Sequence, residues 1–187
     1  MSLRILIPVK PFEEAKQRLA SVLSPLERSR LAEKMFRHVF ATACAFAGPD
    51  AVVVVSRGPD VLDYAKTQGA TALQERIPSE LNSALHQAAA VASDAGASRL
   101  LVLASDLPLL HEADLAALAA HACAIAPDRH ERGTNALIWP TSLEFQFGER
   151  SFERHRMIAK TAGSDAQIII RPGLAHDVDL PGDLLDQ

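Results

Sequence analysis

Short apolar segments recur along this chain, and they constrain its fold more than any other feature of the sequence. Most of them show no alternation of apolar and polar residues, which is typical of strands that are covered on both faces of a sheet. The segments that predict strands are Leu3–Val9, Ala51–Ser56, Gly69–Leu73, Arg99–Ser105, Asn135–Pro140 and Ala166–Arg171. Gly69–Leu73 is the weakest of the six. A chain built on such strands needs helices to cover both sides of its sheet.

Helical patterns fill the intervals between the apolar segments. The clearest helix begins after Ser24, where Pro25 takes the first helical position and Glu27 completes a capping box. It is predicted to run to about Ala45. Four further helices are predicted over residues 60–69, 79–96 (with Ser79 as the cap), 111–124 and 151–163. Alternating strands and helices predict a single α/β domain over residues 1–187, with a mainly parallel sheet whose ligands gather beyond the carboxyl ends of the strands.

The composition excludes several classes of protein. With 187 residues, 48% of them hydrophobic and 22% charged, the chain matches an ordinary globular domain. A net charge of −4 argues against a broad nucleic-acid surface. No apolar run approaches the ~20 residues that cross a bilayer, and Pro8 and Lys10 interrupt any signal-peptide pattern. Cys44 and Cys123 form no CxxC pair and are expected to be reduced thiols. We therefore expect a cytoplasmic protein, with neither nucleic acid nor a membrane among its partners.

Basic side chains follow the first predicted strand. Lys10, Lys16 and Arg18 lie in "PVKPFEEAKQRL", a segment that lacks the glycine-rich phosphate signatures. Each one alone is best explained as a residue of a solvated loop. As a group at a strand end they are suited to a polyphosphate, since lysine acts as a point charge and arginine as a bidentate fork.

Three aspartates occupy the other predicted strand-end positions. Asp106 follows the apolar segment "LVLAS", where it either caps a turn or contributes to a site. In an extended "DVD", Asp177 and Asp179 share one face and Val178 turns inward. Carboxylates so close repel each other unless a cation compensates them, and Mg²⁺ is the natural candidate. The alternative is a solvated acidic turn near the C-terminus.

A glycine and a helix start supply a further candidate. Gly148 lies just ahead of Ser151, which is predicted to cap the following helix, and free backbone N–H groups there suit an anion. The segment "ERGTNAL" likewise brings glycine and a hydroxyl to the start of a strand. Either segment could equally be an ordinary turn. The seven histidines show no metal-binding spacing, and only His176 adjoins a candidate site residue.

Five motifs together carry a resemblance to a known family. They are "PVKPFEEAKQRLASVLSPLERSRLAEKM", "SDLPLL", "DRHERGTNAL", "FGERSFERH" and "HDVDLPGDL". In this order, covering nearly the whole chain, they closely resemble the 2-phospho-L-lactate guanylyltransferase family of coenzyme F-420 biosynthesis. The resemblance implies a nucleotidyltransferase fold like that of the nucleotide-diphospho-sugar transferases, with a mixed sheet and helices on both faces. It also implies transfer of GMP from GTP to 2-phospho-L-lactate, phosphoenolpyruvate or 3-phosphoglycerate, with release of pyrophosphate.

The resemblance also assigns roles to individual residues. The acidic set that would hold two Mg²⁺ ions consists of Asp106, Asp177 and Asp179. The residues that match contacts to the phosphorylated acid are Thr134, Gly148 and Ser151. The nucleotide loop would contain Lys10, Lys16 and Arg18, and Asn82 is a further nucleotide candidate.

The chain departs from the family pattern at two places. It has "ELN" around Asn82 where relatives usually have "GLN", and "DRHERGTN" where they have "DRHGTGTN". Glu131 and Arg132 thus add bulk and charge beside the acid site, which puts the identity of the acid in question. Two other functions stay open: a related metal-dependent nucleotidyltransferase or glycosyltransferase, and a non-catalytic nucleotide-binding regulator. The oligomeric state is open as well, with a homodimer as one alternative.

Overall fold

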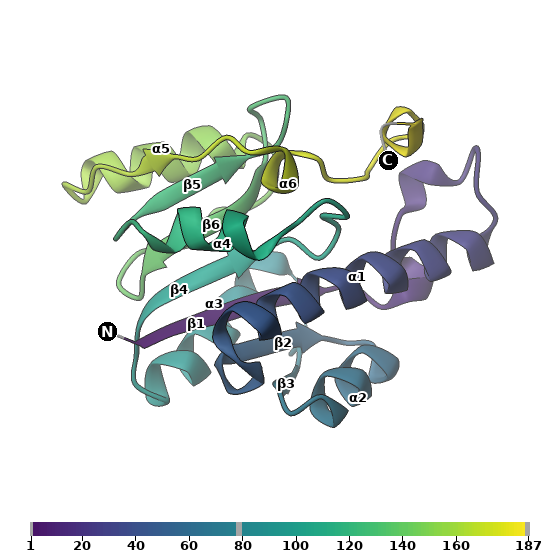
Figure 1. Ribbon diagram of the computed structural model, residues 1–187, viewed down its shortest axis with the longest axis horizontal. Coiled ribbons are helices and arrows are strands. Elements are labelled where there is room, and N and C mark those ends of the chain that lie inside the picture. Colours follow the sequence, from purple (N-terminus) through teal and green to yellow (C-terminus); the bar gives the residue numbers. More distant parts are fainter. Residues whose placement is uncertain (1, 78–79, 186–187) are drawn as a thin grey trace.

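One seven-stranded sheet organises the residues that the structure describes, 2–77 and 80–185 (Figure 1). The strands are β1 (Ser2–Val9), β2 (Val52–Ser56), β3 (Thr71–Gln74), β4 (Ala97–Leu103), β5 (Ala124–Pro127), β6 (Thr134–Pro140) and β7 (Gln167–Ile168). In this computed structural model their order is β3-β2-β1-β4-β6-β5-β7. Only β6 runs antiparallel to its neighbours, β4 and β5. The predicted mainly parallel, mixed sheet is therefore confirmed.

Helices cover both faces of the sheet. One face packs against α1 (Pro25–Ala47), α2 (Pro59–Thr67), α4 (Glu112–Ala119) and α6 (Pro172–Ala175). The other face packs against α3 (Leu81–Asp94) and α5 (Ser151–Thr161). Four short 3₁₀ helices complete the described elements: η1 (Phe12–Glu14), η2 (Gln17–Leu19), η3 (Pro49–Ala51) and η4 (Pro181–Leu185). Within the described residues, no helix combines the length and apolar surface that crossing a bilayer requires.

The long helix α1 begins as its sequence predicts. The Ser24 hydroxyl accepts a hydrogen bond from the Glu27 backbone N–H, and the Glu27 carboxylate accepts one from the Ser24 N–H at 2.8 Å. Its buried face includes Phe36 and Val39, which pack on β1 and β2. The capping box and the helical periodicity are both confirmed.

Two elements near the β5–β7 edge of the sheet are shorter than the sequence predicted. The helix predicted over residues 111–124 ends at Ala119, and Ala124 opens the unpredicted strand β5. "AIAP" is too short and too rich in alanine to be distinguished from a continuing helix by pattern alone. The strand predicted over Ala166–Arg171 is reduced to β7, an edge strand whose one partner among the described strands is β5. The predicted cap at Ser79 lies outside the described residues.

A close contact fixes α6 against the start of α4. The buried Asp114 carboxylate accepts hydrogen bonds from the His111 backbone N–H and the Arg171 side chain. Gly173 lies so close to this carboxylate that an added Cβ would stand 2.1 Å from Asp114 Oδ2 and 2.6 Å from the Leu109 carbonyl oxygen. Because α6 leads directly into Asp177, this contact also sets where the acidic segment begins.

Gly173→Ala is expected to lower the free energy of unfolding by about 1–3 kcal/mol, since overpacking forces the backbone to shift. Urea denaturation measures the loss. Gly182→Ala is the matched control, because a Cβ at Gly182 meets nothing within 4 Å. Equal stability of the two variants would show that α4 and α6 can move apart to accept the added methyl group without loss of stability.

Candidate active site

A cavity opens where the ends of three strands meet at one edge of the sheet. β1 and β4 are parallel neighbours, so the loops after Val9 and Leu103 begin at the same edge. β6 starts there as well because it runs in the opposite direction. The cavity has a volume of about 600 Å³, and its polar wall includes Lys10, Lys16, Arg57, Asp106, Thr134 and Asp179. This is the edge at which the sequence predicts a ligand site.

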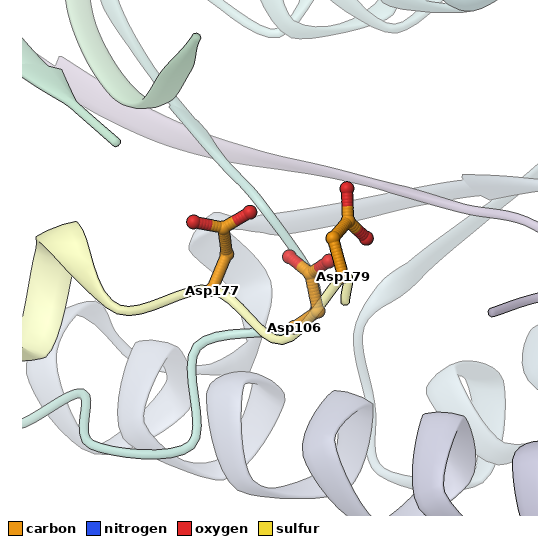
Figure 2. A group of neighbouring side chains, drawn as sticks. All are labelled: Asp106, Asp177 and Asp179. Carbon is orange, nitrogen blue, oxygen red and sulfur yellow. The ribbon is translucent and has the colours of Figure 1, made fainter. Parts of the chain in front are cut away.

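Three aspartates converge at this edge from two separate segments (Figure 2). One carboxylate oxygen each of Asp106, Asp177 and Asp179 lies within 4.8 Å of the other two. Asp106 follows β4, and the other two belong to the extended segment after α6. Val178 between them is 2% exposed and packs with Leu19 and Met35. The predicted geometry of the "DVD" segment, with its valine turned inward, is confirmed.

Lys16 lies between two of these carboxylates. Its ammonium group donates hydrogen bonds to Asp106 and, over 3.0 Å, to Asp179, and its side chain is only 8% exposed. Burial by itself lowers the pKa of the Lys16 amine, but the two carboxylates outweigh burial and raise that pKa above its ordinary value. Lys16 adopts a left-handed backbone conformation (φ 55°) at the start of η2. The sequence predicted that this lysine would face a phosphate; in the structure its partners are carboxylates.

Arg18 and Lys10 are less enclosed than Lys16. Arg18 Nη1 lies 3.6 Å from Asp179 Oδ2, while its side chain is 72% exposed. Lys10 is exposed on the cavity wall. Both can therefore reach a ligand without first breaking a buried contact.

A residue of β6 fixes the position of Asp177. Asn135 Nδ2 donates to Asp177 Oδ1 at 3.0 Å and to the Leu174 carbonyl oxygen, also at 3.0 Å. Burial raises the pKa of the Asp177 carboxyl; the Asn135 hydrogen bond lowers it by less, and Asp106 and Asp179 raise it further. His176 precedes Asp177, and its buried Nδ1 has no hydrogen-bond partner among the described residues. Asn135 is a site residue that the sequence did not single out.

A bulge at the start of β6 separates Thr134 from Asn135. The register with β5 shifts between Ala126, opposite Ala136, and Pro127, opposite Thr134, which leaves Asn135 as the extra residue. Asn135 consequently reaches Asp177 on the α6 side of the sheet. Thr134 contacts His155 of α5 on the other side, with Oγ1 3.0 Å from Nδ1. His155 also escaped the sequence analysis, because a lone histidine in a helix carries no spacing signal.

The segment that carries Gly148 and Ser151 differs from its predicted form. Gly148 adopts φ +119° with open space around it. Ser151 is not the helix cap: it is the first residue of α5, the cap position belongs to Arg150, and no side chain caps this end. The buried Ser151 nonetheless lies near Thr134, since Phe152 donates its backbone N–H to the carbonyl oxygen of Arg132.

Asn82 makes two hydrogen bonds to the backbone of Phe147. Its Nδ2 donates to the Phe147 carbonyl oxygen at 3.1 Å, and its Oδ1 accepts from the Phe147 N–H at 2.8 Å. The amide thus fixes the segment before Gly148, and Phe147 itself lines the cavity. A direct contact between Asn82 and a nucleotide stays a prediction.

Two further aspartates shape the loops of the site. Asp128 accepts hydrogen bonds from the backbone N–H groups of His130, Arg132 and Gly133, and a Cβ at Gly133 would stand 2.7 Å from this carboxylate. Asp183 accepts from the N–H groups of Asp179 and Leu180, both at 2.7 Å. Arg129 pairs with Asp183 and so joins the two loops. Arg132 is exposed and forms no ion pair with Glu131 among the described contacts.

The fold of this chain matches solved structures described as a nucleotidyl transferase and a nucleotide-diphospho-sugar transferase. The chain superimposes on a nucleotidyl transferase from Methanothermobacter thermautotrophicus with a TM-score of 0.67, covering 98% of this chain and 94% of that one at 15% identity. A protein of Desulfovibrio desulfuricans G20, assigned as a nucleotide-diphospho-sugar transferase, matches with a TM-score of 0.76 at 17% identity, covering 98% and 85%. At these identities the likeness establishes the fold alone. It is the nucleotidyltransferase fold that the family resemblance predicted.

The chain belongs to the family described as "Guanylyl transferase CofC like", which matches residues 3–187. It is 41% identical to phosphoenolpyruvate guanylyltransferase of Rubrobacter xylanophilus over 98% of this chain and 92% of that protein. It is 35% identical to 2-phospho-L-lactate guanylyltransferase of Methanothermobacter thermautotrophicus over 96% and 81%. The predicted family is therefore confirmed.

The acidic cluster has the chemistry of a divalent-cation site. Carboxylate oxygens are the ligands that Mg²⁺ prefers, and three of them meet here. Two of these carboxylates already bind a cationic group, the Lys16 ammonium. The third is the one whose pKa is raised by burial and by its acidic neighbours. These three carboxylates could hold a divalent cation, and their oxygen donors are of the type that Mg²⁺ takes.

Asp177→Asn is expected to raise the free energy of unfolding at neutral pH without divalent cations. A raised pKa in the folded state means that the folded protein binds the extra proton, so the wild type loses stability as pH rises from the ordinary pKa of 3.8 toward the raised value. The amide avoids that loss, and its advantage should vanish below the ordinary pKa. Urea denaturation across this range in EDTA measures the difference, with Asp63→Asn on the exposed face of α2 as control. A less stable Asp177→Asn at neutral pH would contradict the assigned cause.

Proposed function

We propose that this protein transfers GMP from GTP to a small phosphorylated carboxylic acid and releases pyrophosphate, as a step of coenzyme F-420 biosynthesis. The observation that carries the proposal is the cluster of Asp106, Asp177 and Asp179 beside the basic loop at the strand ends. Relatives named for phosphoenolpyruvate guanylyltransfer reach 41% identity, and one named for 2-phospho-L-lactate reaches 35%. Phosphoenolpyruvate is accordingly the first acid to test.

The reaction needs no general base, because a phosphate monoester is largely dianionic at pH 7. One of its oxygens forms a bond to the α-phosphorus of GTP. The bond from that phosphorus to the bridging oxygen breaks, and pyrophosphate leaves with the electron pair. The protein's task is to position two anions against their repulsion, which is about 4 kcal/mol per unit pair at 4 Å and an effective dielectric of 20. Catalysis is then mainly positioning and electrostatics.

Separate groups of residues perform this positioning. Lys10, Lys16 and Arg18 receive the phosphates of GTP, with Asn82 supporting the nucleotide side through Phe147. Thr134, the backbone at Gly148 and Ser151 receive the phosphorylated acid. Asp106, Asp177 and Asp179 would hold Mg²⁺, two ions in the full complex. When bound, Mg²⁺ would neutralise phosphate charge during the displacement.

The direct test is mass spectrometry of the product formed from GTP and each candidate acid, together with a pyrophosphate assay. Sugar phosphates test for a related nucleotidyltransferase or glycosyltransferase. GTP binding without pyrophosphate release from any of these acceptors would indicate a non-catalytic nucleotide-binding protein and contradict the proposal.

Asp177→Asn and Asp179→Asn are each expected to lower kcat by at least about a hundredfold. Each substitution removes a charged carboxylate that would hold the metal beside the reacting phosphates. Circular dichroism checks that the fold persists, and Asp63→Asn serves as the control for charge alone. Mn²⁺ binding followed by electron paramagnetic resonance should weaken in both site variants. Turnover like that of the wild type in either variant would remove that aspartate from the mechanism.

Arg132→Gly is expected to change the ranking of phosphoenolpyruvate, 2-phospho-L-lactate and 3-phosphoglycerate, while the KM for GTP changes little. Arg132 is exposed two residues before Thr134, and we expect its guanidinium to approach the carboxylate of an acid bound at Thr134. The measurement is kcat/KM for the three acids, since selectivity is a ratio of these values. Parallel changes for all three acids would show that Arg132 does not select among them.

A further inference from the structure

His155 and Thr134 form a buried pair in the wall of the cavity. The His155 side chain is 0% exposed, and the rings of Trp139 and Phe147 pack edge-on against it at centroid distances of 5.7 and 4.7 Å. Its Nδ1 lies 3.0 Å from Thr134 Oγ1. Its Nε2 accepts a hydrogen bond from the Gln146 backbone N–H at 3.1 Å. Both ring nitrogens are thus occupied inside the protein.

These contacts determine which nitrogen carries the proton. A backbone N–H can only donate, so Nε2 must be unprotonated. Burial, and after it the charge of Arg154, lower the pKa of His155 to about 4, so the ring is neutral near pH 7. A neutral imidazole keeps one proton, which must then be on Nδ1. His155 therefore donates to the Thr134 hydroxyl oxygen.

The direction of this hydrogen bond decides what the Thr134 hydroxyl offers to the cavity. Because its oxygen accepts from His155, its hydrogen cannot point back at the ring. Among the described residues, His155 is the only hydrogen-bond partner of that hydroxyl. Thr134 lines the same cavity as Lys16, Asp106 and Asp179. The hydroxyl hydrogen is thus available to an anion in the cavity.

We propose that His155 is a positioning residue that fixes the Thr134 hydroxyl as a hydrogen-bond donor to an anionic oxygen of the phosphorylated acid. The identity of the anion rests on the proposed function; the direction of the hydrogen bond does not. With the opposite direction, Thr134 would present a lone pair and repel the anion. The bulge at Asn135 supports this role, since it turns Thr134 toward His155 and away from the Asp177 side.

The first test is the tautomer of His155 in the wild-type protein. ¹⁵N NMR of the imidazole should show a protonated Nδ1 and an unprotonated Nε2, unchanged between pH 6 and pH 9. This measurement needs no substrate and no variant that must fold. A proton on Nε2, or a doubly protonated ring near pH 7, would overturn the inference.

The second test is a double-mutant cycle on the KM for phosphoenolpyruvate. His155→Leu removes the donor and should raise this KM about tenfold, with kcat and the KM for GTP changing much less. His155→Asn, whose amide N–H can replace Nδ1–H, should recover most of the loss. In a Thr134→Val background, His155→Leu should have no further effect, because its influence acts through the missing hydroxyl.

If His155→Leu changed the KM for phosphoenolpyruvate equally with and without the Thr134 hydroxyl, His155 would be a packing residue only. That result would overturn the inference on His155 and leave the proposed function untouched. A wild type that turns over none of the phosphoacids would instead refute the proposed function. The NMR result would still decide the direction of the hydrogen bond in that case.

Discussion

Mutual repulsion among three carboxylates is the constraint on which the rest of this site depends. Asp106, Asp177 and Asp179 meet within 4.8 Å although each would be more stable apart from the others. The protein holds them by contacts on the side away from the cavity. Asn135 binds Asp177, Asp183 binds the backbone at Asp179, and the buried Val178 fixes the segment between them. The cavity side is left to cations, and the chain itself supplies the largely buried Lys16 and the more exposed Arg18.

Aspartates therefore have two distinct uses in this chain. In the cluster they offer charge to ligands, whereas Asp114, Asp128 and Asp183 accept hydrogen bonds from backbone N–H groups and fix loops around the site. The acidic C-terminal segment combines both uses over a few residues. A loop fixed by carboxylate–backbone hydrogen bonds keeps its shape without a hydrophobic core of its own.

The sequence predicted the mainly parallel sheet, the Ser24 cap of α1 and the convergence of the three aspartates, because each depends on local pattern or on strand-end geometry. Asp106 could be associated with Asp177 and Asp179 since parallel strands end at one edge and an extended "DVD" has one possible facing. Asn135, His155 and Asp183 could not be predicted in the same way. Their roles arise from contacts between segments far apart in the chain, and the bulge that turns Thr134 and Asn135 apart has no sequence signal. The Lys16–Asp106 contact was missed for a related reason. The sequence predicted that Lys16 would bind a phosphate, but Lys16 and Asp106 face the same cavity and bind each other.

The bulge in β6 also makes the chemistry of this edge a matter of register. Regular alternation through Thr134 and Asn135, without the bulge, would place Thr134 on the α6 side, beside the acidic cluster, and Asn135 toward α5. The gain or loss of such a bulge can thus exchange a hydroxyl for an amide beside the carboxylates while the sheet keeps its strand order. For a fold that is shared by transferases of different substrates, a single step of this kind offers evolution a discrete route between acceptor sites.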